Sequence, residues 1–373
     1  MKSWFGRKSA PAARPLLHRA YAGAAGVGEW PRNYEAQARE AYLGNPVAQR
    51  AVRLVAESVA WAPVYATDGA AGAAASAKAL KLATPALLDA AASQLLLHGN
   101  AFVQILLDAD AAPAELFALR PERVSVEADA GGWPAAYVYR AGSVKARLPA
   151  RDALGRPGLV HIKSMHPLDD HYGLGCLGAA AGAVAIHNEA TRWNKALLDN
   201  AARPSGALTL DVGDGALAAE QYDRLRDELE LHFAGTANAG RPLLLEGGLK
   251  WQAMSLTPAD MDFAGMKAAA AREIALAFGV PPMLLGLPGD STYANYREAN
   301  RALWRLTVLP LADKLLGGIA AALGAWWPGL GLALDVDQVT ALAEDRERLW
   351  AQVTAADFLS REEKREMLGF STT

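Results

Sequence analysis

Cysteine is nearly absent from this chain, which has a single one, Cys176, among 373 residues. One cysteine cannot close an intrachain disulfide bond, and one thiolate cannot by itself hold a zinc ion or an iron–sulfur cluster. Folds that depend on disulfide bonds or on a cysteine-bound metal are therefore excluded. Apolar packing must hold the chain together, and a hydrophobic fraction of 52% is enough for a substantial core.

An excess of positive charge is also absent. The chain has 37 Lys and Arg residues against 40 Asp and Glu residues. Proteins that hold nucleic acid tightly concentrate basic residues, because neutralised phosphates release counterions and this release supplies much of the affinity. Any contact of this chain with nucleic acid is therefore predicted to be loose.

Long apolar runs are missing as well. Residues 1–27 are basic and rich in Ala, Gly and Pro, without the continuous apolar region of a secretory signal, so we expect a flexible N-terminal arm. The most lipid-like stretch, residues 173–186, is about fourteen residues long, whereas roughly twenty are needed to cross a bilayer. We therefore expect no membrane anchor.

The sequence contains no motif of a catalytic machine. There is no G-x-x-x-x-G-K-[ST] phosphate loop, no G-x-S-x-G nucleophile elbow and no convincing pair of carboxylates. We expect a chain that is not an enzyme, has no catalytic residues and binds neither a cofactor nor a metal. An ATP-driven motor is unsupported, so energy for any transport must come from a partner.

Residues 173–178, Gly-Leu-Gly-Cys-Leu-Gly, match the G-x-G-x-x-G pattern of dinucleotide-binding folds. That fingerprint needs a strand leading directly into its first glycine, whereas a polar loop, residues 166–172, precedes Gly173 here. We favour a turn that opens a closely packed helix. A Rossmann-type oxidoreductase that uses a nucleotide stays open as an alternative function.

Three histidines, His161, His166 and His171, lie close in sequence to Asp169 and Asp170. Such residues can bind metal ions, but no helical pair of histidines fixes their geometry. The favoured interpretation is that His161 packs in a strand and the others cap a surface loop.

The first half of the chain predicts an α+β domain with a mostly antiparallel sheet, because several short strands follow one another without helices between them. Asn45-Pro46 and Thr84-Pro85 each place a cap residue and a first-turn proline at the start of a helix, and Gly99 suits the position after the second helix. Residues 68–77 are predicted to form a flexible loop. The predicted strands are residues 102–107, 116–119, 124–127, 137–140, 144–148 and 159–165.

The middle of the chain predicts two long helices around a small insert. The first covers about residues 180–200, and the second begins at Thr257-Pro258 and is stopped by residues 279–282, Gly-Val-Pro-Pro. Between them, the pattern predicts a strand, a helix and two further strands at residues 207–212, 217–233, 242–246 and 250–256.

A third long helix is predicted from about residue 294 to residue 323, after a polar loop at residues 288–292. Pro310 lies within it and predicts a kink. A strand at residues 332–336 and a C-terminal helix with a capping box formed by Ser360 and Glu363 follow.

This order of segments, from about Asn45 to Phe370, resembles the portal proteins of long-tailed bacteriophages. The resemblance depends on four ordered motifs, which are residues 99–103 (GNAFV), 159–163 (LVHIK) leading to 173–175 (GLG), 278–286 (FGVPPMLLG) and 291–295 (STYAN). The compact length and the composition rich in Ala and Arg are most similar to the portals of bacterial gene transfer agents.

The resemblance implies a division of the chain into named regions. A wing domain at residues 28–179 would be followed by a stem helix at 180–202, a clip insert at 203–257 and a second stem helix at 258–280. A tunnel loop and kinked helix at 281–325, a return strand of the wing at 326–340 and short helices of a crown at 341–373 would complete the chain.

The implied function is a homo-oligomeric ring, a dodecamer, at one vertex of a capsid. Double-stranded DNA would pass through it non-specifically during packaging and ejection. Its partners would be the terminase large subunit, the head–tail connector and the major capsid protein, first in the bacterial cytoplasm and then at the portal vertex of a phage or phage-like particle. A head–tail adaptor ring is a further alternative, although such adaptors lack paired stem helices.

The resemblance also suggests which residues face DNA or a partner. Arg297, Arg301 and Arg305 repeat every four residues, which by itself favours a solvated basic face, whereas in a ring their helix would approach the axis. The predicted channel residues are Asp290, Ser291, Thr292, Tyr293, Arg297, Arg301, Arg192 and Lys195. The residues predicted to dock a partner on the clip are Asp227, Glu228, Glu230, Thr236 and Asn238.

Overall fold

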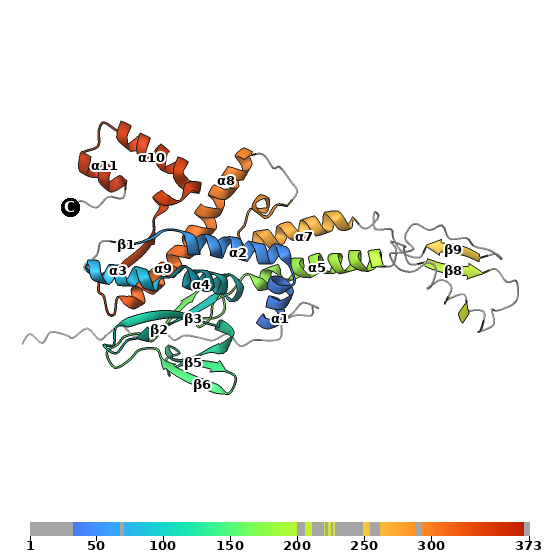
Figure 1. Cartoon of the computed structure of the whole chain (residues 1–373), viewed down its shortest axis with the longest axis horizontal. Coiled ribbons are helices and arrows are strands. Elements are labelled where there is room, and N and C mark those ends of the chain that lie inside the picture. The colour runs from blue at the N-terminus through green and yellow to red at the C-terminus, as the bar shows by residue number, and fades with distance from the viewer. Residues whose placement is uncertain are drawn as a thin grey trace, which may run out of the picture. The chain divides into compact units, whose positions relative to one another are not determined.

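The computed structural model describes residues 33–67, 71–199, 206–210, 220, 223–224, 227, 249–253, 262–287 and 293–368. The chain forms two compact units, one from residues 1–180 with 275–373 and one from residues 181–274 (Figure 1). The predicted arm at residues 1–27 lies outside the described residues.

The larger unit contains most of the regular structure. In chain order its helices and strands are α1 (Tyr34–Ala38), α2 (Pro46–Trp61), β1 (Val64–Thr67), α3 (Ala73–Leu82), α4 (Pro85–His98), β2 (Asn100–Leu107), β3 (Pro113–Leu119), β4 (Val124–Ala128), β5 (Pro134–Ala141), β6 (Val144–Pro149), β7 (Leu159–Lys163), α8 (Tyr293–Leu303), α9 (Leu309–Leu323), β10 (Gly331–Leu334), α10 (Ala343–Ala355) and α11 (Arg361–Met367). Short 3₁₀ and π-helical turns connect several of them.

The described strands pair only in antiparallel fashion, as predicted. One sheet has the order β3-β2-β7, a second has the order β4-β5-β6, and β1 pairs with β10. A core cluster between the two three-stranded sheets consists of Phe102, Leu119, Val124, Tyr137 and Leu159. Helices α2, α4 and α9 pack on one another, while α4 contacts β2 and α9 contacts β7 (Figure 1).

The predicted helix ends are confirmed in this unit. The Asn45 side chain accepts hydrogen bonds from the backbone N–H groups of Val47 and Ala48, which caps α2. Gly99 ends α4 with a φ of 82°, a left-handed conformation that favours glycine. The capping box of Ser360 and Glu363 is also present.

The flexible loop predicted at residues 68–77 is wrong in its second half, because α3 begins at Ala73. The Ala-rich segment lacks a clear apolar stripe, but alanine has the highest intrinsic preference for helix, and burial of Ala79 and Leu82 adds packing. Helix α1 and the π-helical turn Arg39–Leu43 were not predicted.

The third long helix is interrupted, as Pro310 predicted, but the irregularity precedes the proline. A π-helical turn, Trp304–Val308, separates α8 from α9, and Pro310 lies in the first turn of α9. Proline has no backbone N–H, and the first turn of a helix makes no hydrogen bond with that group, so Pro310 fits there. In the middle of a regular helix its ring would clash with the carbonyl group four residues earlier.

By length and composition, the helical run Ala294–Leu323 could cross a membrane, whereas the most lipid-like stretch by sequence is residues 173–186. Its α9 half owes its apolar composition to the core. The fully buried side chains of α9 are Ala312, Leu315, Leu316, Ile319 and Leu323.

The smaller unit contains most of α5 (Leu177–Asp199), most of α7 (Phe263–Ala277) and the strands β8 (Gly206–Leu210) and β9 (Leu249–Ala253). Trp193 of α5 stacks on Phe263 of α7 at 4.2 Å between ring centroids, and His187 lies near Lys267. From His187 to Trp193 the residue numbers rise along α5, while their neighbours on α7 fall in number from Lys267 to Phe263. The two helices therefore run antiparallel, side by side (Figure 1). They are the two long helices that the sequence predicted, and their assignment to a stem stays a prediction.

Within the predicted clip insert, β8 and β9 pair in antiparallel fashion. The predicted strand at residues 242–246, most of the predicted helix at 217–233 and the Thr257-Pro258 cap lie outside the described residues.

Candidate functional site

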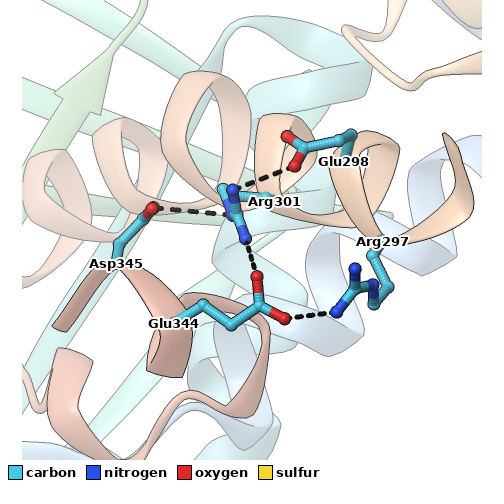
Figure 2. Close-up of polar contacts among 5 residues, drawn as sticks. All are labelled: Arg297, Glu298, Arg301, Glu344 and Asp345. Atoms are coloured by element: carbon cyan, nitrogen blue, oxygen red, sulfur yellow. Dashed lines mark hydrogen bonds and ion pairs between the residues drawn. The ribbon is translucent and has the colours of Figure 1, made fainter. Parts of the chain in front are cut away.

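A cluster of five charged residues connects α8 with the beginning of α10 (Figure 2). Arg301 on α8 lies at its centre, with Nη1 3.0 Å from Glu298 Oε1 and Nη2 2.6 Å from Glu344 Oε2. Arg297, one turn earlier on α8, pairs with the other carboxylate oxygen of Glu344. A single carboxylate on α10 therefore bridges two arginines on α8.

Burial distinguishes the two arginines. The side chain of Arg301 is 10% exposed, whereas that of Arg297 is 50% exposed. Arg301 Nε lies 3.6 Å from Asp345 Oδ2, near enough for charge attraction but too far for a hydrogen bond, and it is buried without a hydrogen-bond partner. The interpretation of a fully solvated basic face is thus wrong for Arg301.

The predicted channel residues on α5 are also paired with acids. Arg192 forms an ion pair with Glu189, and Lys195 Nζ lies 2.6 Å from Asp199 Oδ2, all with exposed side chains. Each basic residue on this face therefore has an acidic partner within its own helix. The polar face of α5 carries mixed charge, with no net positive stripe.

Several predicted site residues cannot be placed. Asp290, Ser291, Thr292, Glu228, Glu230, Thr236 and Asn238 lie outside the described residues. Tyr293 is described only as the first residue of α8, and Asp227 is helical and exposed. The structure thus brings together Arg297 and Arg301, and separately Arg192 and Lys195.

The glycine motif at residues 173–178 has a packing role. A Cβ atom on Gly173 or Gly175 would come closer than 3.0 Å to backbone atoms of Gly99, Ser164, Leu97 or His98. Gly99 is equally crowded by the backbone of residues 173–175. Two chain segments therefore cross at backbone contact, and α5 begins just beyond them, which agrees with the favoured interpretation.

The alternative of a nucleotide-binding fold receives no support from this geometry. Strand β7 ends at Lys163, ten residues before Gly173, and it belongs to an antiparallel sheet. The fingerprint requires a parallel strand that leads directly into the glycines.

Asn100 joins the two crossing segments by hydrogen bonds. Its side chain is 0% exposed; Oδ1 accepts hydrogen bonds from Gly173 N at 2.7 Å and His161 Nε2 at 2.9 Å, and Nδ2 donates to Gly173 O at 3.1 Å. His161 stacks on Phe102 with 4.2 Å between ring centroids. Burial, followed by the charge of Lys163, lowers the pKa of His161 to about 3, so this ring is neutral.

The other two histidines of the predicted cluster have separate contacts. His171 Nε2 donates to the backbone oxygen of Gly132 at 2.6 Å, and His166 Nδ1 accepts from Leu168 N at 3.1 Å. Among the described residues, no group of three His, Cys, Asp or Glu side chains could hold a metal ion. Strand packing explains His161 and loop structure explains the others.

The acidic residues of the charged cluster on α10, Glu344 and Asp345, were not predicted from the sequence. Glu344 and Asp345 lie more than forty residues after the arginines, and nothing local links the two segments. The available signal was a pair of acids in the first turn of a helix, where they also interact favourably with the helix dipole.

Two surfaces of mixed charge are thus present, one on α5 and one between α8 and α10, and the antiparallel helices α5 and α7 flank the paired strands β8 and β9 in the sequence. A family model described as "Phage portal protein" matches residues 46–369. The chain therefore belongs to the phage portal protein family.

Relatives of this chain occur among known proteins. The chain is 41% identical over 349 residues to a protein of Rickettsia felis, with 88% of each chain covered. It is 25% identical over 162 residues, 43% of this chain and 35% of the relative, to a probable portal protein of Streptomyces phage phiC31.

Solved structures show the same fold. A chain from the virion of a native gene transfer agent particle is 47% identical, with a TM-score of 0.70 and coverage of 94% of this chain and 98% of that one. An HK97-family phage portal protein from Corynebacterium diphtheriae, 16% identical with a TM-score of 0.56, covers 80% of this chain and 96% of its own and agrees in fold alone.

Proposed function

We propose that this portal protein assembles into a closed ring of twelve subunits at the neck of a phage-like particle. The observation that carries the proposal is the 47% identity, over 94% of the chain, to a protein in the neck of a gene transfer agent particle that was computed with C12 symmetry, with a TM-score of 0.69. Identical subunits that contact one another head to tail close into a ring when the rotation permits.

The proposed role of the ring is to let double-stranded DNA pass without being held. The mixed charge of the α5 face supports this role, since each basic residue there has an acidic neighbour that weakens its attraction for phosphate. The charge of the whole chain, with 37 basic and 40 acidic residues, points the same way.

The partners follow from the same role. We propose that the insert at residues 203–257 docks the terminase large subunit, with Asp227, Glu228, Glu230, Thr236 and Asn238 as the docking residues. A connector would bind the assembled ring later, and the major capsid protein would surround it at the vertex. The loop with Asp290, Ser291 and Thr292 would approach the DNA.

Electron microscopy of the purified full-length protein tests the assembly. We expect closed rings with a central hole, and mass photometry should give twelve times the mass of one chain. A compact monomer across micromolar to high protein concentrations would contradict the proposed function.

A further inference from the structure

Helix α8 is held in place differently from α9, although the two belong to one helical run. Five side chains of α9 are completely buried, as described above, whereas the buried residues among the α8 side chains that the structure describes are Arg301 and Leu303. The π-helical turn Trp304–Val308 stands between them. Such turns are uncommon inside helices and are frequent at functional sites.

Helix α10 has equally little apolar anchoring. Val353 is its one buried residue, and its first turn carries Glu344 and Asp345, which face Arg301 (Figure 2). Apolar burial is the usual means of fixing a helix on its neighbours. For α8 and α10, the ion pairs take the place that apolar contacts have elsewhere in the unit.

We propose that Arg297, Arg301, Glu344 and Asp345 form an electrostatic latch that fixes the direction of α8 by docking it on α10. When the latch is weakened, α8 and α10 loosen together about the π-helical turn, while α9 stays in the core. The device belongs to one subunit, so it holds whether or not the subunits form the proposed ring.

The two ion pairs should respond differently to salt. Arg297 and Glu344 are about half exposed, at 50% and 48%, so dissolved ions screen their attraction. Arg301 is 10% exposed, and its pairs are screened much less. Raising the salt concentration should loosen the latch slightly. Removing the Glu344 carboxylate should open it, because the buried Arg301 then keeps only Glu298, on its own helix, and the more distant Asp345 as charged partners.

Hydrogen exchange of the full-length protein, followed by mass spectrometry, measures the latch directly. In Glu344→Gln, we expect the amides of α8 and α10 to exchange at least about tenfold faster, with those of α9 unchanged. Glu57→Gln is the matched control, because Glu57 lies 2.7 Å from Arg53 in a pair on α2 and the substitution removes the same charge. This control should leave α8 unaffected.

A double substitution separates coupling from general damage. Arg301→Gln alone leaves Glu298, Glu344 and Asp345 without their shared cation, so the carboxylates repel one another. Adding Glu344→Gln removes one of these charges and should restore part of the protection. Arg297→Gln gives a milder variant, expected to raise exchange of α8 a few-fold, if Arg301→Gln does not fold.

Two results would overturn the latch. One is unchanged exchange of α8 and α10 in Glu344→Gln and Arg297→Gln. The other is exchange that rises equally in α8, α9 and α10, since this would show global destabilisation in place of local opening.

Discussion

At the scale of single residues, Asn100 and Arg301 are two of the buried polar residues in the larger unit, and they differ in kind. Asn100 is 0% exposed, and its amide oxygen and nitrogen both find partners at hydrogen-bond distance. Arg301 is nearly as buried but leaves Nε without a hydrogen bond. A neutral network whose hydrogen bonds are all made favours a single arrangement of the core. Removing one partner from a buried ion cluster is costly, whereas replacing the whole cluster by apolar residues of similar volume costs little.

The first prediction concerns the loss of folding stability at acidic pH and the contribution of His161 to it. Its folded-state pKa of about 3 lies below the ordinary value of 6.5, so between these values the unfolded chain takes up a proton that the folded chain does not. Stability is therefore complete above about pH 6.5 and falls as the pH decreases, by up to about 1.4 kcal/mol per pH unit. Burial lowers the pKa of His98 as well, which adds to the same trend.

Urea unfolding at about pH 7.5, 6 and 5 checks this prediction. His161→Gln should be less stable than the wild type at the highest pH, because its stacking on Phe102 is lost. Its stability should also depend less on pH. An identical pH dependence in wild type and variant would show that His161 titrates normally.

At the scale of elements, the sequence predicted those features that local chemistry determines. Asn45-Pro46, Thr84-Pro85 and Gly99 marked helix ends correctly, because capping involves only neighbouring residues. The start of α3 was missed, since an Ala-rich segment has high helix preference but little pattern. The contact of α10 with α8 was out of reach, because it joins segments more than forty residues apart.

The second prediction separates packing from nucleotide binding within one motif. Gly173→Ala and Gly175→Ala would force a Cβ atom against backbone that cannot give way, so each should destabilise the protein by at least about 3 kcal/mol or prevent folding. Gly178, in the first turn of α5, has nothing within 4 Å of its added Cβ. Gly178→Ala should be neutral or stabilising by up to about 1 kcal/mol.

Thermal unfolding of the three variants checks this order. In a nucleotide-binding motif, the turn and the bound nucleotide together determine which glycines are required, so this order of effects would not be expected. Equal effects of the three substitutions would contradict the packing role of the crossing between residues 97–99 and 173–175.

At the scale of the whole molecule, family membership could be predicted from ordered motifs, while the positions of functional side chains could not. The sequence pattern located two long helices, and α5 and α7 confirm that they exist, whereas their role as the stem of a portal stays a prediction. The resemblance suggested Arg192, Lys195, Arg297 and Arg301 as residues that line the channel. Their acidic partners became visible only in the folded chain, and these acids give the surfaces around the basic residues a mixed charge.

The last prediction uses this mixed charge to locate the DNA path. Lys195 and Asp199 form an exposed pair four residues apart, with the base preceding the acid, an orientation that stabilises a helix by less than about 0.5 kcal/mol. Asp199→Asn should therefore leave folding and assembly intact while freeing one positive charge per subunit.

If this face of α5 lines the channel, rings should bind short double-stranded DNA more tightly at low salt, with a steeper salt dependence, because freed lysines neutralise phosphates. Glu35→Gln is the matched control, since Glu35 of α1 and Arg39, directly after α1, form a similar exposed pair 2.8 Å apart, and the substitution adds the same charge to the chain. Fluorescence anisotropy between about 50 and 500 mM salt measures both variants. Equal DNA binding by Asp199→Asn and Glu35→Gln rings would mean that net charge alone matters and would place the polar face of α5 away from the DNA.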